Sequence, residues 1–220
     1  MASTGRSTPA ALRSYVRRVR RSCRLLPPLH GDVWLRVLYR MLPVNCRFAH
    51  LQVERPDAIC CAYGCGRVET QHHALHACPQ IHPVWAFHRG AWGHYGVSFS
   101  WSTISDPDLF EVNQVGDPHK EALGILWRLL VGATLHLIWA QHNKVQYEDA
   151  TPLPYLAWTE LSFLGWMTSV RRWLRLQDPD CPVRSSAVCV LHNLRVQAAY
   201  RFLWAKHPNS LLLAPTSPAA

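Results

Sequence analysis

The feature that most constrains this chain is a dense group of cysteines and histidines between residues 60 and 78. The 19 residues CCAYGCGRVETQHHALHAC hold four of the eight cysteines and three of the thirteen histidines. Thiolate and imidazole are the ligands that suit a tetrahedral zinc ion, and a structural zinc site needs four of them close together. The segment therefore predicts a metal site built from donors that are near one another in the chain.

The first half of this segment carries the thiolates. Cys61 and Cys65 form a CxxxC pair, and Gly64 between them lets the backbone wrap two sulfurs around one ion. Cys60 directly precedes Cys61 and is a second choice for the first ligand. The residues by themselves leave that choice open.

The second half is an HxxxxC pair, formed by His73 and Cys78. Thr70 is placed to cap a short helix that begins at Gln71, and Pro79 forces that helix to end. Because the helix stops there, Cys78 can turn back toward the ion. Two neighbouring imidazoles compete with His73 for the same role, namely those of His72 and His76.

Several short patterns occur together here: Cys65-Gly66, Glu69-Thr70, His73, Leu75, Cys78-Pro79 and Val84-Trp85. This combination resembles the zinc-binding domain downstream of the polymerase in reverse transcriptases of retrotransposons that lack long terminal repeats. The preceding VWLRVLYRMLPVNCRFAH is similar to the helical lead-in of that domain, so the resemblance covers residues 31–92. LHLIWAQHN, at 135–143, is similar to a helix that often follows the zinc motif in these elements.

The resemblance implies one structural zinc ion bound by Cys61, Cys65, His73 and Cys78. The family commonly spaces its first two cysteines CxxC, and the shorter gap from Cys61 is closer to that pattern than the gap from Cys60. Only His73 preserves the HxxxxC spacing. With four protein ligands the ion has no open position for water, so its expected role is structural.

Helical spacing of apolar residues, interrupted at prolines and glycines, predicts a mainly α fold with a small CCHC zinc-knuckle module and a helical C-terminal unit. Expected helices follow Asp32 up to Pro43 and cover 81–92, 121–147, 155–176 and 185–206. The expected core of the C-terminal unit includes Leu126, Leu130, Trp139, Trp166 and Trp173. The predicted division is a basic arm at 1–30, a reverse-transcriptase-type zinc-binding domain at 31–95, a linker at 96–118, the helical unit at 119–207 and a disordered tail at 208–220.

One expected helix has roughly the length of a membrane span, at residues 122–140. Arg128 and His136 lie inside it, and a central arginine costs about 2.5–3.5 kcal/mol on insertion into a bilayer. We therefore expect a buried core helix and no membrane partner.

The formal net charge is +9, and only three of the 23 basic residues are lysine. A guanidinium group can bind a phosphate through two hydrogen bonds, so the excess of arginine over lysine favours nucleic acid as the partner. We expect single-stranded RNA or DNA. Seven arginines precede the first acidic residue, Asp32. The expected nucleic-acid-binding residues are Arg13, Arg17, Arg18, Arg20, Arg21, Arg24 and, beside Cys65, Arg67. Tyr63 is a candidate stacking ring.

Sequence patterns of catalysis are missing. No carboxylate pair suits a two-metal polymerase, and neither the deaminase HxE…PCxxC pattern, GxSxG nor a P-loop is present. We expect a non-catalytic, zinc-binding and nucleic-acid-binding C-terminal module of such a reverse transcriptase, without polymerase activity of its own. The alternative is a zinc-stapled helical scaffold or protein-interaction domain. No secretory signal is visible, so we expect an intracellular protein, nuclear or cytoplasmic rather than mitochondrial.

Overall fold

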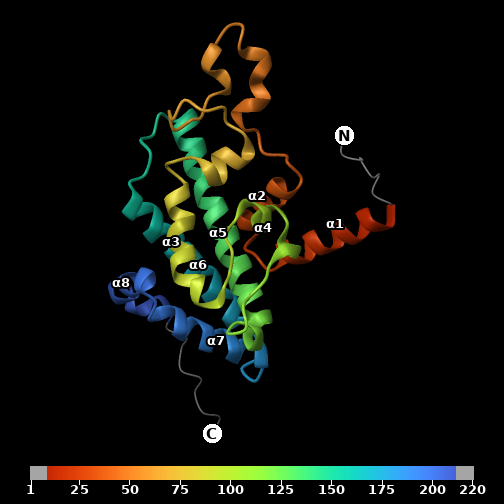
Figure 1. The fold of residues 1–220 in the computed structure, drawn as a ribbon, viewed down its shortest axis with the longest axis vertical. Coiled ribbons are helices and arrows are strands. Elements are labelled where there is room, and N and C mark those ends of the chain that lie inside the picture. The colour runs from red at the N-terminus through yellow and green to blue at the C-terminus, as the bar shows by residue number, and fades with distance from the viewer. Residues whose placement is uncertain (1–8, 212–220) are drawn as a thin grey trace.

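The computed structural model describes residues 9–211, and within them it contains helices and no strand. Figure 1 shows the arrangement. The α-helices are α1 (Pro9–Arg24), α2 (Pro28–Leu38), α3 (His82–Trp92), α4 (Trp101–Ser105), α5 (Lys120–Tyr147), α6 (Tyr155–Arg175), α7 (Pro182–Arg195) and α8 (Ala198–Lys206). Short turns of helix lie between them, including η1 (Asn45–Leu51), η2 (Pro56–Ile59) and η3 (His73–Ala77). The mainly α prediction is confirmed.

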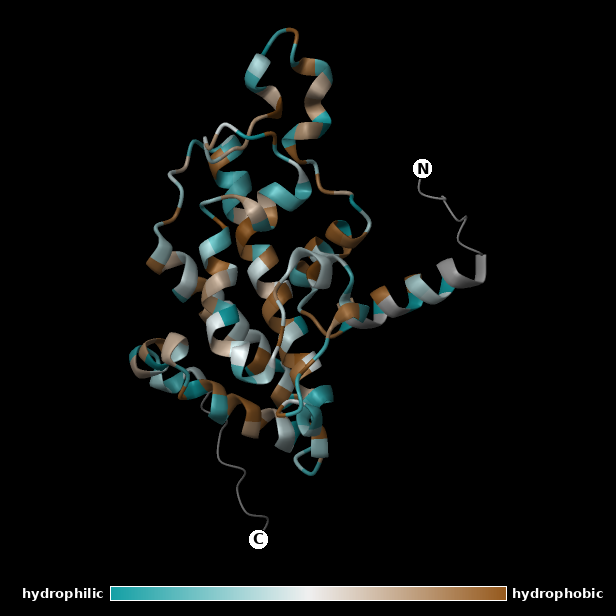
Figure 2. Ribbon diagram, in the orientation of Figure 1, coloured by the Kyte–Doolittle hydropathy of each residue, from teal (hydrophilic) through white to brown (hydrophobic). Residues whose placement is uncertain are grey.

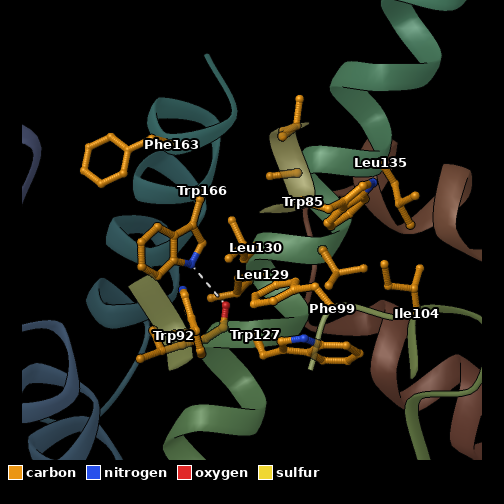
Figure 3. Close-up of a cluster of buried hydrophobic side chains, with 14 of the residues drawn as sticks. Trp85, Trp92, Phe99, Ile104, Trp127, Leu129, Leu130, Leu135, Phe163 and Trp166 are labelled. Carbon is orange, nitrogen blue, oxygen red and sulfur yellow. Dashed lines mark hydrogen bonds between the residues drawn. The ribbon is translucent and has the colours of Figure 1, made fainter. Parts of the chain in front are cut away.

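The core is built around α5, which packs against α2, α6 and α7, while α3 packs against α6 and α8. Large aromatic side chains fill the space beside α5, and Figure 3 shows Trp85, Trp92, Trp127 and Trp166 in this cluster. The Trp166 indole donates a hydrogen bond to the carbonyl oxygen of Leu126 at 3.0 Å. The N–H group of a buried tryptophan usually finds a hydrogen-bond partner, and this bond joins α6 to α5.

Of the five expected core residues, four are buried: Leu126, Leu130, Trp166 and Trp173. Trp139 is only partly buried. By length and composition α5 could cross a membrane, but 72% of its most apolar stretch is buried inside the protein. Figure 2 shows hydrophobic residues along α5.

The boundaries of α2 differ from the sequence expectation. The helix begins at Pro28 rather than at Asp32, because the fixed φ of proline suits the first helical position. Asp32 lies instead on the surface and pairs with Arg36 at 2.9 Å. At the other end the helix stops at Leu38, well before Pro43.

The predicted helix at 185–206 is two helices, α7 and α8, separated by an extended residue, Gln197. The break turns α8 against α3, where the buried Tyr200 hydroxyl bonds His88 at 2.7 Å and Trp92 at 3.0 Å. These partners lie more than a hundred residues away in the chain. Tertiary contacts therefore decide this break, and helical spacing alone could not predict it.

The segment predicted as a linker, 96–118, takes part in the core. Phe99 and Ile104 are buried, and the carbonyl of Ile104 accepts a hydrogen bond from Trp34 at 3.0 Å. The carbonyl of Ser98 accepts another from Trp127 at 3.2 Å. Glycine and proline mark irregular backbone, but irregular backbone is not always solvated, because buried carbonyls here find indole donors.

The basic arm is also partly docked. In α1 the side chain of Val19 is buried, and Tyr15 meets Tyr39 edge to face at 6.3 Å. Figure 1 shows the N-terminal part of α1 extending away from the body, and its C-terminal part beside α2. Residues 1–8 and 212–220 lie outside the described residues, and so do the side chains of Arg18 and Arg21.

Candidate metal centre

Four side chains converge at one point: Cys61, Cys65, His73 and Cys78. Their ligand atoms all lie within 4.8 Å of one another. The sulfurs of Cys61 and Cys78 are 3.7 Å apart, and the Cys65 sulfur is 3.2 Å from Nε2 of His73. Two sulfurs at about 2.3 Å from a tetrahedral zinc ion lie about 3.8 Å apart, so the sulfur spacing fits one such ion.

The loop from Cys61 to Val68 brings the first two sulfurs together. Gly64 and Gly66 have φ angles of 72° and 73°, a left-handed conformation that glycine adopts without steric cost. The N–H of Gly64 bonds the carbonyl of Cys61 at 2.9 Å, and the N–H of Cys61 bonds the carbonyl of Arg67 at 2.9 Å. Backbone hydrogen bonds therefore close the loop around the Cys61 and Cys65 sulfurs.

The segment that carries His73 and Cys78 forms a wider helical turn than the sequence predicts. Thr70 caps it as expected, since its hydroxyl accepts a hydrogen bond from the His73 N–H at 3.1 Å. Residues His73–Ala77 form a π turn, closed by a bond of 2.9 Å from the Cys78 N–H to the His73 carbonyl. The five-residue spacing of a π turn puts Cys78 near His73, and the chain leaves the helix at Cys78.

The residues that compete for these roles point elsewhere. The Cys60 sulfur lies 4.0 Å from an oxygen of Asp57, outside the group. His72 stacks on Trp101 at a centroid distance of 5.3 Å. Nε2 of His76 lies 2.8 Å from the carbonyl oxygen of Phe99. The converging group therefore contains Cys61 rather than Cys60, and His73 rather than His72 or His76.

The protonation of the group suits a cation. A hydrogen bond joins Cys61 and Cys78, and it raises the pKa of the Cys61 thiol while it lowers the pKa of Cys78. Thiolates are the form that binds a metal ion, so the ion would replace the proton that Cys61 and Cys78 can share. Burial lowers the pKa of His73 and favours its neutral form, which is the form that binds metals.

The buried carboxylate of Glu69 holds the loop in place through hydrogen bonds. Glu69 accepts hydrogen bonds from the Asn45 N–H at 3.0 Å, the Ala62 N–H at 2.8 Å and Nε2 of His142 at 2.9 Å. Burial by itself raises the pKa of Glu69, but its bonds to His142 and to the two amides outweigh burial and lower it. Ala62 directly follows Cys61, so Glu69 holds the backbone that carries this ligand.

His142, on α5, bonds Glu69 at the end of the loop 61–69, which is called the metal loop below. Both side chains of the Glu69–His142 pair are almost fully buried, and Trp139 stacks on His142 at 4.8 Å with an interplanar angle of 10°. No sequence motif predicts a site role for His142. In the sequence, only the position of His142 within LHLIWAQHN, at 135–143, could have pointed to a role in the site. The fold shows that this side chain reaches the metal loop.

Of the residues expected to contact nucleic acid, the structure buries one and separates the others into two places. Tyr63 is buried, with 9% of its surface exposed, and it packs edge-on against His142. It is therefore not available as an exposed stacking ring. Arg67 is exposed, and so are four arginines of α1, namely Arg13, Arg17, Arg20 and Arg24. In Figure 1 the extended part of α1 and the metal loop lie well apart, so α1 and Arg67 do not form one patch.

No known protein family, curated protein or solved structure matches the chain.

Proposed function

We propose that this chain is a helical module held together by one structural zinc ion, and that it binds single-stranded nucleic acid without polymerase activity of its own. The observation that carries the proposal is the convergence of three sulfurs and one imidazole nitrogen within 4.8 Å. In line with the resemblance at residues 31–92, we propose that it is the C-terminal module of a reverse transcriptase from a retrotransposon without long terminal repeats. Its setting would then be intracellular.

Zinc is the metal that the donor set favours. Thiolates select zinc, copper(I) or iron–sulfur chemistry, and a single ion with three sulfurs and one imidazole is a common structural zinc arrangement. When bound, the ion would supply a cross-link between the loop and the turn, with no open position for catalysis. Cys61 and Cys65 would hold it from the loop, His73 and Cys78 from the turn.

The charge of the chain supports nucleic acid as the partner. The net charge is +9, and all but three of the 23 basic residues are arginine. Exposed arginines lie on α1 and, as Arg67, within the metal loop. Phosphate backbones attract such surfaces through the release of counterions. Ring-and-cation surfaces bind single strands with little sequence preference.

Two observations favour the alternative, a zinc-stapled scaffold that binds another protein. The metal loop is tied to α5 by the buried Glu69–His142 pair, so the ion would also stabilise the helical unit. Near the other end of the chain, Phe202 on α8 is 70% exposed. Both proposals share the metal ion, and only a nucleic-acid assay separates them.

The metal is tested on the purified full-length chain by elemental analysis. We expect one zinc ion per chain, and Cys78→Ser should lose it. Cys189→Ser is the matched control, because Cys189 is exposed and lies outside the converging group. Full zinc occupancy in Cys78→Ser would overturn the ligand set.

Nucleic-acid binding is tested by fluorescence anisotropy with single-stranded RNA and DNA at several salt concentrations. If Arg13, Arg17, Arg20 and Arg24 all contact phosphates, changing the four to glutamine should reduce the log–log salt slope by about 3, at roughly 0.7 per contact. These substitutions are preferable to deleting α1, since Val19 is buried. A zinc-loaded chain with no affinity at low salt would reject this function in favour of the scaffold.

A further inference from the structure

A surface pocket of about 260 Å³ lies directly beside the metal centre. It is bounded by the end of α2, by η1, by the residues that precede the ligand His73, and by α4. The lining residues are Arg40, Val44, Cys46, Arg47, Thr70, Gln71, His72 and Trp101. Two cations and two aromatic rings therefore line one hollow, which residues 70–72, directly before His73, help to form.

Arg40 occupies a backbone position that favours glycine. Its φ is 54°, and the N–H groups of Arg40 and Met41 bond the carbonyls of Val37 and Arg36. This is the Schellman arrangement that ends α2, in which the left-handed residue is usually glycine. An arginine here carries a steric cost that folding does not require. Strain of this kind clusters at functional sites.

The two guanidinium groups are available for an anion. Arg40 and Arg47 are both exposed, and within the described part of the chain neither forms an ion pair. Both line the same pocket. Guanidinium is the side chain that matches phosphate geometry with two parallel hydrogen bonds, so a phosphate is the anion that this pair fits best.

The opposite wall is made of rings that are already packed together. His72 stacks on Trp101 at 5.3 Å with an interplanar angle of 29°, and His76 lies 5.6 Å from His72 and 6.2 Å from Trp101. The His76 ring is anchored by its contact with the Phe99 carbonyl at 2.8 Å. His72 and Trp101, the two members that line the pocket, are thus held in position before any ligand arrives.

The metal centre and the end of α2 fix the shape of the pocket. Thr70, Gln71 and His72 are the residues immediately before the ligand His73. The Gln71 amide donates a hydrogen bond of 2.8 Å to the carbonyl of Val37, which joins this segment to α2 next to Arg40. The segment that leads to the ligand His73 is therefore fixed against the end of α2, beside Arg40.

We propose that this pocket is the nucleotide site of the module. A phosphate of a single strand lies between Arg40 and Arg47, and the adjoining base packs on the rings of His72 and Trp101. Cations beside stacking rings are the combination that holds single strands without sequence preference. The pocket is slightly smaller than the ~300 Å³ at the low end for enclosed small-molecule sites, which favours one unit of a polymer that continues along the surface. This inference rests on the proposed function and gives it a location.

The experiment measures the affinity of the full-length, zinc-loaded chain for a fluorescent single-stranded RNA oligomer. Loss of one charged hydrogen-bonding group is expected to weaken binding about tenfold, so Arg40→Gly and Arg47→Gln should each show that loss. Trp101→Leu removes stacking and should weaken binding by about tenfold as well. Arg201→Gln on α8 is the matched control for charge and should change the affinity less than twofold.

An abasic oligomer separates the two halves of the pocket. It should still respond to Arg40→Gly and should no longer respond to Trp101→Leu, since it has phosphates but no bases. Arg40→Gly places the preferred residue in a left-handed position, so its weaker binding would not be explained by unfolding. Zinc content is measured for every variant.

The possible failures are distinguishable. If the unmodified chain binds no oligomer at low salt, the proposed function and this site both fall. If it binds and the three pocket variants match Arg201→Gln, nucleic-acid binding stands and this site is wrong. If inorganic phosphate competes for the pocket at the same concentration as oligonucleotide phosphate, and Trp101→Leu changes nothing, the pocket is an anion site and the proposal is overturned.

Discussion

Replacing Glu69 by alanine should loosen the metal loop and destabilise the whole module. The change removes the acceptor for three donors: the N–H groups of Asn45 and Ala62, and Nε2 of His142. Each buried donor left without a partner costs about 1–3 kcal/mol. The bonds from the Asn45 N–H and from Nε2 of His142 are buried, which gives roughly 2–6 kcal/mol for these two donors. The buried carboxylate no longer has to be desolvated, which offsets part of this cost.

After this offset we expect a net loss of about 2–5 kcal/mol. Against a typical total stability of about 5–15 kcal/mol, this is a large fraction. Because Ala62 adjoins the ligand Cys61, zinc affinity should also fall by about 10- to 100-fold, as for other residues that orient metal ligands.

Two assays check this expectation. Urea unfolding followed by far-ultraviolet circular dichroism gives the free energy of unfolding, and competition with a zinc chelator gives the metal affinity. Glu54→Ala is the control, because Glu54 is exposed and its replacement should change stability by no more than about 0.5 kcal/mol. A Glu69→Ala protein within 1 kcal/mol of the parent chain and with unchanged zinc affinity would refute the supporting role of Glu69.

Three further predictions follow from single residues. Cys61→Ser should abolish stoichiometric zinc while Cys60→Ser retains it, as measured by elemental analysis; the reverse result would exchange the two ligands. Burial lowers the pKa of His88 to about 3, so below its ordinary value of 6.5 the unfolded chain takes up a proton that the folded chain does not. The stability advantage of the parent chain over His88→Gln in urea unfolding should therefore shrink between pH 6.5 and pH 4, by up to about 1.4 kcal/mol per pH unit, and a constant advantage would contradict it. Arg40→Gly should raise the melting temperature by about 2 °C, through relief of about 1 kcal/mol of left-handed strain. Arg36→Gly, inside α2, should lower it by a similar amount, and equal losses in both variants would remove the case for strain.

Local patterns in the sequence were enough to predict the helices and the ligand-bearing segment. Helical periodicity and proline breaks depend on neighbouring residues, so the ranges of α5 and α6 could be read with small errors at their ends. The thiolates and imidazoles also lie within 19 residues of one another, and Thr70 and Pro79 signalled the turn between His73 and Cys78. When all the ligands of a site lie in one short segment, their spacing can be recognised in the sequence.

Contacts between distant segments were decided only by the tertiary structure. Cys60 and Cys61 are neighbours in the chain, so the sequence separates either one from the other ligands by almost the same number of residues. Only the folded loop shows that Cys61 points toward those ligands. His142 lies 73 residues from Glu69, so no local pattern marks their bond. The pocket of Arg40 and Trp101 likewise joins the end of one helix to the start of another. Periodicity records which face of an element is apolar, but it carries no information about which distant element covers that face, and this is why the support of the metal centre and the pocket beside it emerged only from the fold.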